Sequence, residues 1–279
     1  MKFDLHCHTK EGSIDAKISI EEYVKKLITL GYDGMLVTDH NSYRGYERWK
    51  EVADSLKKSK PFTVLRGIEY DTRNGGHMIA VLPEKVSAKI LETRGMTVAQ
   101  VEKVVHMLGG ILGPAHPYGT GYFALMHTHH IKKNPDLIKK FDFIETFNAA
   151  TKPLANKRAE LLARKYGKVS FSGSDAHKDK HVGSAFTIID REIRNTDDLI
   201  HFVREHGSTI TGGTVTEKVN GILGMIAEKI GIAGYWIYNK TGAALKIKSR
   251  REIFRELSAF FEDKHWYKEH KRGNVHGAI

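Results

Sequence analysis

The stretch DLHCHT, residues 4–9, places two histidines on either side of one cysteine close to the start of the sequence. In an extended strand alternate side chains point the same way, so His6 and His8 lie on one face and both imidazoles can reach a single ion. Cys7 points to the opposite face, where we expect it to pack rather than react. The pair is a weak signal by itself, because MHTHH at 126–130 repeats the spacing. Other parts of the chain must supply further ligands.

The composition is typical of a folded protein from a reducing compartment. The chain has 279 residues, 41% hydrophobic and 28% charged, enough to bury a large core in one α/β domain with or without a small appendage. Its single cysteine excludes an internal disulfide framework and leaves histidine and carboxylate as metal ligands. No run of about 18 apolar residues occurs, and the first residues lack the order of a secretory signal. We therefore expect a cytoplasmic protein without membrane insertion.

The net charge favours anionic partners. The formal charge is +11, which suits phosphate esters or nucleic acid. Residues 240–279 hold ten Lys or Arg against five Asp or Glu, so this tail alone supplies five of those charges. Two interpretations of the tail stay open: a solvated basic helix, or a surface that contacts nucleic acid or a membrane.

Short apolar segments alternate with longer amphipathic ones over most of the chain. Residues 2–6 and 34–40 have the pattern of strands, and 19–32 has apolar residues at helical spacing with Ser19 as its N-cap. Repetition of this order predicts a parallel sheet, either closed into a barrel or open and doubly wound. The pattern changes after residue 215, so we predict a main domain over 1–215 and a basic, mostly helical extension over 216–279.

Imidazoles and carboxylates recur where the predicted strands end. The carboxyl ends of barrel strands share one rim, so side chains far apart in the sequence can converge in one pocket. The residues concerned are His6, His8, His40, Glu69, His77, His116, Asp175 and His177. Zinc, manganese and iron accept such nitrogen and oxygen ligands, and a carboxylate can bridge two ions. More than four ligands implies more than one metal ion.

Seven motifs in order resemble one known family. DLHCHT, VTDHN, GIEY, GGHMIAVLP, PAHPYG, IETFN and SGSDAH look like the motifs of the PHP (polymerase and histidinol phosphatase) family of metal-dependent phosphoesterases, and they span residues 1 to about 190. The resemblance implies an α/β fold of TIM-like type, a distorted seven-stranded (β/α)7 barrel. It also implies up to three metal ions at the carboxyl ends of the strands.

The resemblance assigns a ligand set to each ion. A first ion would be held by His6, His8, Glu69 and Asp175. Glu69 would bridge to a second ion held with His77 and His116, and a third would be held by Asp15, His40 and His177. Family members commonly have an acid five residues after the second histidine, where this chain has Ser13. Asp15 follows two residues later, so either the loop is longer or the third ion is held more loosely.

Two or three closely spaced divalent ions lower the pKa of a bound water toward about 7, hold phosphoryl oxygens and stabilise the leaving oxygen. The resemblance therefore implies an enzyme that hydrolyses phosphoester bonds with a metal-bound hydroxide, acting on a nucleotide, an oligonucleotide end or a small phosphomonoester. Position alone suggests four residues for the substrate phosphate: Lys152, Arg158, Lys178 and His181. The alternatives are a histidinol-phosphate phosphatase and a non-catalytic binding module in a nucleic-acid-processing assembly. Retention of nearly all ligands argues against the module.

Overall fold

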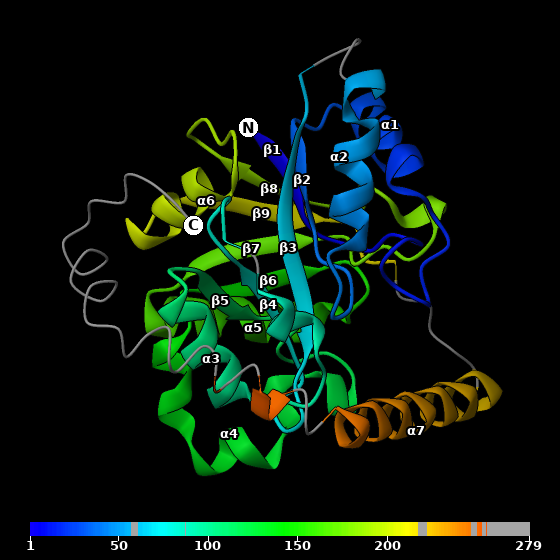
Figure 1. Cartoon of the computed structure of the whole chain (residues 1–279), viewed down its shortest axis with the longest axis vertical. Coiled ribbons are helices and arrows are strands. Elements are labelled where there is room, and N and C mark those ends of the chain that lie inside the picture. Colours follow the sequence, from blue (N-terminus) through cyan, green and yellow to red (C-terminus); the bar gives the residue numbers. More distant parts are fainter. Residues whose placement is uncertain (57–60, 87, 217–221, 247–249, 253–254, 256–279) are drawn as a thin grey trace.

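The computed structural model describes residues 1–56, 61–86, 88–216, 222–246, 250–252 and 255 (Figure 1). Its strands are β1 (Lys2–Cys7), β2 (Gly34–Val37), β3 (Thr63–Asp71), β4 (His77–Val81), β5 (Ile111–Pro114), β6 (Phe143–Asn148), β7 (Val169–Gly173), β8 (Ala185–Ile189) and β9 (Thr209–Gly213). Its α-helices are α1 (Ile20–Thr29), α2 (Arg44–Leu56), α3 (Val98–Met107), α4 (His129–Lys133), α5 (Pro153–Tyr166), α6 (Thr196–Arg204) and α7 (Ile222–Leu245). Short 3-10 turns join several of these elements.

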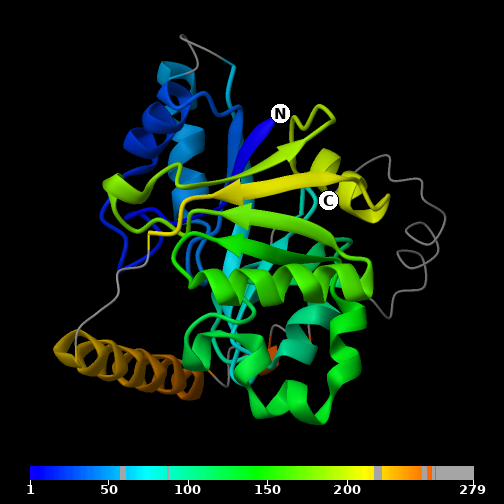
Figure 2. The same cartoon turned by 180° about the vertical axis from the view of Figure 1, so that it is seen from behind.

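Seven strands form one curled sheet in the order β5-β4-β3-β2-β1-β8-β9, and β6 pairs with β7 in a second sheet. Contacts of β6 with β5 and of β7 with β1 bring the small sheet against the large one, and α5 packs on the small sheet (Figure 2). The fold is therefore mixed α/β with a curled half-barrel at its centre, which confirms the predicted class.

The prediction of a parallel sheet holds for only part of the molecule. The pairs β1–β2, β2–β3 and β6–β7 are parallel. The pairs β3–β4, β4–β5, β1–β8 and β8–β9 are antiparallel. A parallel crossover needs about a dozen residues. The segment TRNGG at 72–76 is too short for one, so the chain turns back on itself between β3 and β4.

Helix α1 begins where the sequence predicts. The Ser19 side chain accepts a hydrogen bond from the Glu22 backbone N–H, and the Glu22 carboxylate accepts one from the Ser19 backbone N–H. This capping box satisfies two amide groups that a helix start leaves without partners. Tyr23, Val24 and Leu27 then bury one face of the helix, which lies beside α2 on the same side of the sheet (Figure 1).

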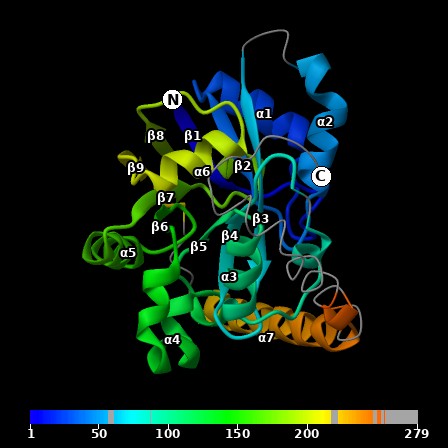
Figure 3. The same cartoon turned by 60° about the vertical axis from the view of Figure 1, so that its left-hand side comes forward.

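Helix α7 carries the start of the predicted extension and packs across the lower part of the molecule (Figure 3). The buried Asn239 side chain donates a hydrogen bond to the Tyr122 hydroxyl at 3.4 Å, and the Arg94 guanidinium lies 4.3 Å from the centre of the Tyr238 ring. Most of the basic part of the extension, residues 256–279, lies outside the described residues. Among those that are described, no helix combines the length and apolarity needed to cross a bilayer.

A glycine lets β7 approach β1 closely. A Cβ added at Gly173 would lie 2.1 Å from the His6 Cβ, well inside any tolerated contact. The last residues of β7 therefore run directly beside the first histidine of DLHCHT. This approach brings SDAH, residues 174–177, next to a motif that is almost 170 residues away in the sequence.

We expect His106 to stabilise the fold in a pH-dependent way. Its Nε2 lies 2.8 Å from Asp142 Oδ2, and this bond to Asp142, together with the Glu102 carboxylate, raises the histidine pKa. The folded pKa exceeds the unfolded value of about 6.5, so the stabilisation is complete below about pH 6.5 and is lost as pH rises through the folded pKa. His106→Ala should lower the free energy of unfolding by about 1 kcal/mol at low pH and by less at high pH. Urea unfolding at pH 6 and pH 8.5 measures this, with exposed His127→Ala as control. Equal destabilisation at both pH values would contradict it.

Candidate metal centre

One buried carboxylate lies at the middle of the centre. Glu69, near the end of β3, is fully buried and is approached by imidazoles from several strand ends. The Oε1 atom lies 3.0 Å from His77 Nδ1, 3.1 Å from His116 Nε2 and 3.5 Å from His6 Nε2. The Oε2 atom lies 3.1 Å from His40 Nδ1 and 3.4 Å from His8 Nε2. Oε2 is buried without a hydrogen bond, so a cation is a suitable partner for it.

Two further acids extend the cluster toward solvent. Asp175 Oδ1 lies 3.2 Å from His8 Nε2 and 3.7 Å from His6 Nε2. Asp15 Oδ2 lies 3.3 Å from His177 Nε2 and 3.7 Å from His40 Nε2, and its side chain is 45% exposed. The structure thus brings together all nine residues that the sequence singled out as ligands. Asp15 sits at the outer edge of the group and not in its interior.

Strand ends and unusual backbone conformations position these side chains. Asn41, His116 and Asp175 adopt positive φ angles of 48°, 28° and 51°. Such angles are uncommon for residues other than glycine and persist only where surrounding contacts fix them. All three follow shortly after strands of the centre. These strained backbone conformations therefore occur in the turns that direct side chains into the cluster around Glu69.

Hydrogen bonds to the outer ring nitrogens fix the orientation of three histidines. His6 Nδ1 donates to Glu145 Oε1 at 2.9 Å, and His177 Nδ1 donates to the Asp175 carbonyl at 3.0 Å. Ser13 donates its hydroxyl proton to Asp39, so its oxygen accepts from His8 Nδ1 at 3.1 Å. Each bond leaves Nε2 to face the cluster. This pairing of a ligating imidazole with an outer acceptor is the usual arrangement around protein-bound metals.

Asp71 also lies in the centre, although it is not among the residues predicted from the sequence. Its Oδ1 lies 3.2 Å from His40 Nδ1 and 3.3 Å from His77 Nε2, and the side chain is fully buried. The signal was present in the sequence. Asp71 follows Glu69 by two residues, so both side chains lie on the same face of β3.

Glu145 and Asn148, both in β6, were also missed as functional residues. Glu145 supports His6, and one of its oxygens accepts from the His116 backbone N–H at 2.5 Å. The Asn148 amide donates to Asp175 Oδ2 at 3.1 Å. Both belong to IETFN, so their presence in a motif was the available signal.

The donor atoms fall into four overlapping groups in which all atoms lie within 4.8 Å of one another. The groups are His6, His8 and Asp175; His6, Glu69 and His116; His8, His40 and His177; and His40, Asp71 and His77. Nitrogen and carboxylate oxygen in these proportions suit zinc, manganese or iron. His77 is grouped with Asp71 and His40, whereas the sequence had paired it with His116.

The buried acids and imidazoles of the cluster shift one another's pKa values. Burial alone would raise the pKa of Glu69, but the imidazoles of His77, His6 and His40 hold it well below its usual range. Burial would lower the pKa of His40, but Glu69 and Asp71 raise it to about 10. Burial, followed by the nearby His177 and His40, lowers the pKa of His8 to about 3. His8 is therefore neutral, the form in which an imidazole binds metal.

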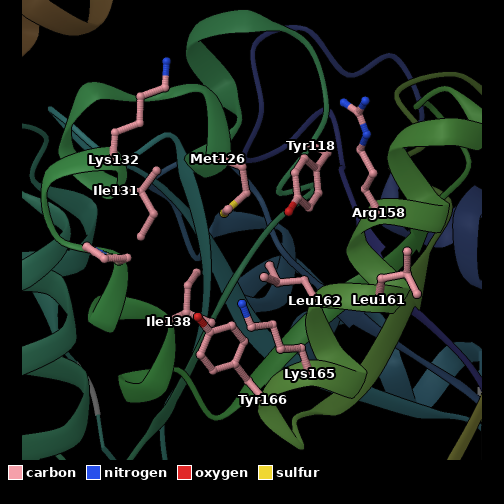
Figure 4. A pocket seen from close by; sticks show the side chains of 11 residues that line it. Tyr118, Met126, Ile131, Lys132, Ile138, Arg158, Leu161, Leu162, Lys165 and Tyr166 are labelled. Atoms are coloured by element: carbon pink, nitrogen blue, oxygen red, sulfur yellow. The ribbon is translucent and has the colours of Figure 1, made fainter.

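The four residues suggested for phosphate binding lie at or on α5 and in the segment that follows His177. Lys152 is exposed and directly precedes α5, and Arg158 is exposed on that helix. Lys178 is exposed immediately after His177, and His181 ends the 3-10 turn Asp179–His181. Figure 4 shows Arg158 at a cavity beside α5. Their role in phosphate binding stays a prediction.

Known protein structures share this fold, and one family model matches part of the chain. A family model described as PHP-associated matches residues 153–206. A candidate metal-dependent phosphoesterase from Bifidobacterium adolescentis superposes with a TM-score of 0.54 at 15% identity, covering 74% of this chain and 96% of its own. No curated protein matches the chain in sequence.

Two larger proteins share the same fold. One is a two-domain protein from Bacteroides vulgatus that contains a predicted PHP-like metal-dependent phosphoesterase, with a TM-score of 0.53, 16% identity and coverage of 77% of this chain and 65% of its own. The other is a lesion-specific endonuclease from Pyrococcus furiosus, with a TM-score of 0.53, 17% identity and coverage of 75% and 57%.

Removal of bound metal should destabilise the protein. An ion present at a hundredfold its dissociation constant stabilises the folded state by about 2.7 kcal/mol. For a protein of this size, we expect chelation to lower the melting temperature by about 5–10 °C. Differential scanning calorimetry before and after treatment with EDTA, and again after addition of Mn²⁺, measures the change. The same melting temperature before EDTA, after EDTA and after addition of Mn²⁺ would contradict a metal centre.

Asp71→Asn should weaken metal binding while preserving the shape of the side chain. Removal of its charge beside His40 and His77 is expected to lower the affinity for at least one ion about 10- to 100-fold. Elemental analysis after dialysis against graded Mn²⁺ or Zn²⁺ gives the number of ions retained. The control is Asp136→Asn, an exposed carboxylate outside the centre. Metal content equal to that of the wild type would mean that Asp71 only holds Asn41 and Arg94 in place.

Proposed function

The chain contains a PHP-family domain, and from this premise we propose that it hydrolyses phosphoester bonds with the help of divalent metal ions. One observation carries the proposal: five imidazoles from four segments of the chain surround the buried Glu69 carboxylate within 3.5 Å. An arrangement that serves only stability would not need so many costly buried polar groups. The four donor groups suit a multinuclear centre.

The proposed ligands divide among three ions. His6, His8, Glu69 and Asp175 hold the first ion; Glu69, His77 and His116 hold the second; and Asp15, His40 and His177 hold the third. Asp71 joins the second or third through His77 and His40. When bound, such ions supply an activated water and neutralise the phosphoryl oxygens of a substrate.

The residues of this chain contribute position and charge to that chemistry. Glu145, Ser13 and the Asp175 carbonyl hold the Nδ1 atoms of three histidines, so each Nε2 keeps its direction through a catalytic cycle. The half-exposed Asp15 marks the side from which a substrate enters. In this proposal Lys178, next to His177, and His181 contact a phosphate that arrives there, and Lys152, which precedes α5, and Arg158 on that helix supply further positive charge.

We propose nucleotides or oligonucleotide ends as the substrate class, ahead of a small phosphomonoester such as histidinol phosphate. The net charge of +11 favours a polyanion, and one protein of the same fold is an endonuclease. In this proposal residues 1–215 form the catalytic domain, and the two sheets together make the distorted barrel typical of the family. The basic extension over 216–279 adds a contact for nucleic acid, and the protein works in the cytoplasm.

Removal of the His8 imidazole should abolish turnover. In His8→Ala one ligand between Asp175 and Glu69 is missing, so we expect hydrolysis of para-nitrophenyl phosphate with Mn²⁺ to fall at least about a hundredfold. Circular dichroism checks that the variant is folded, and exposed His127→Ala is the matched control. Wild-type rates in His8→Ala would refute the assignment. Inactivity of the wild type with and without chelator, together with intact oligonucleotide binding, would favour a non-catalytic module.

A further inference from the structure

A cavity of about 450 Å³ lies between α5 and the segment that follows His116 (Figure 4). Its lining comes from two places in the sequence: residues 118–138, which hold the 3-10 turns and α4, and residues 158–166 of α5. The lining residues are Tyr118, Met126, Ile131, Lys132, Pro135, Ile138, Arg158, Leu161, Leu162, Lys165 and Tyr166. None of the nine candidate metal ligands is among them, so the cavity is separate from the metal centre.

The charge of the cavity is entirely positive. Among the described residues, Lys132, Arg158 and Lys165 line it, and no acidic side chain does. Figure 4 shows Lys132 and Arg158 on opposite sides with Tyr118 between them. The acid of α5 is occupied elsewhere, since Glu160 pairs with Lys157 and Arg164. Across the described residues, none of the three cavity cations has an ion-pair partner. Three cations around one hollow suit an anion with more than one charge.

The floor of the cavity is apolar and aromatic. Ile131, Ile138 and Leu162 are buried, and Tyr118 and Tyr166 pack half-buried against the same core. Both tyrosines line the cavity, and the Lys165 ammonium lies 5.4 Å from the centre of the Tyr166 ring. Aromatic faces beside unpaired cations are the combination with which proteins bind single-stranded nucleic acid, because bases stack on the rings while phosphates meet the cations.

The cavity is close to the metal centre along the chain. Tyr118 follows the candidate ligand His116 by two residues, so their Cα atoms lie within about 7 Å of each other. A hydrogen bond from the Gly119 N–H to the His116 carbonyl, at 2.7 Å, tightens this turn. This short turn connects the candidate ligand His116 to the cavity lining along the chain.

We propose that this cavity binds a nucleotide next to the phosphate that is cleaved, in a single-stranded oligonucleotide. The base would stack on Tyr118 or Tyr166, and the flanking phosphates would meet Lys132, Arg158 and Lys165. This inference rests on the proposed phosphoesterase function and narrows its substrate class. A small phosphomonoester would fill the metal centre alone and leave the cavity without a role.

Binding measured in EDTA tests the cavity independently of catalysis. Fluorescence anisotropy with a labelled single-stranded dT hexamer should give about tenfold weaker affinity for the double variant Lys132→Ala/Lys165→Ala. The slope of log affinity against log salt should fall by about 0.7 for each phosphate that the variant no longer neutralises. With metal restored, the KM for the same hexamer should rise more than kcat changes.

Neighbouring cations provide a matched control. Lys133→Ala/Arg164→Ala removes two charges from the adjacent positions, neither of which lines the cavity, and should bind as the wild type does. Equal weakening in both double variants would overturn the proposal and indicate a diffuse basic surface. Equal affinity for dT hexamer and for an abasic oligomer of the same length would overturn the stacking role.

If neither the wild type nor the variants hydrolyse a phosphoester, the proposed function is refuted. The anisotropy comparison would still show whether the cavity binds the oligonucleotide.

Discussion

The buried carboxylate of Glu69 is the constraint on which the centre depends. A charged group without access to water is strongly destabilising unless opposite charge or hydrogen bonds compensate for it. Here compensation comes from imidazoles that reach Glu69 from β1, β4 and the segments after β2 and β5. The fold brings these segments within reach by curling its sheet, by turning sharply between β3 and β4, and by using Gly173 to admit the end of β7 beside His6. The convergence of the strand ends therefore also supplies the imidazoles that stabilise the buried Glu69 charge.

Replacement of the expected acid by Ser13 changes how the outer part of the centre is built. Ser13 connects two buried groups: it donates to Asp39 and accepts from His8, so it orients an imidazole instead of contacting an ion itself. The carboxylate that faces His40 and His177 comes instead from Asp15, on a more exposed part of the same loop. The inner ligands are therefore fixed by burial, while the outermost acid lies where solvent competes with it. If an ion binds at Asp15, His40 and His177 as proposed, this exposure would let it exchange more readily than an ion held by the buried residues.

The convergence of most of these residues could be predicted because they occur in short motifs at strand ends. His6 and His8 follow from the two-residue repeat of a strand, and Asp175 and His177 follow from a motif whose neighbour Gly173 requires close packing. Two kinds of information could not be obtained this way. The antiparallel pairing of β4, β5, β8 and β9 depends on connection length and tertiary packing, which periodicity does not report. Asp71 shares a strand face with Glu69 and Glu145 lies in the motif IETFN, but only the three-dimensional arrangement shows that they contact His40 and His6.

The contact between α7 and Arg94 ties the C-terminal segment to the centre. Asp71, beside His40 and His77, lies 3.6 Å from the Arg94 guanidinium, and Arg94 in turn is covered by the Tyr238 ring. Cutting the chain at residue 215 to isolate the catalytic part would remove that cover and let water reach the arginine. In a shortened protein produced for crystallisation or assay, the Asp71 carboxylate would then be more hydrated and held less rigidly by Arg94. For this molecule, a polypeptide that retains α7 is the appropriate starting material.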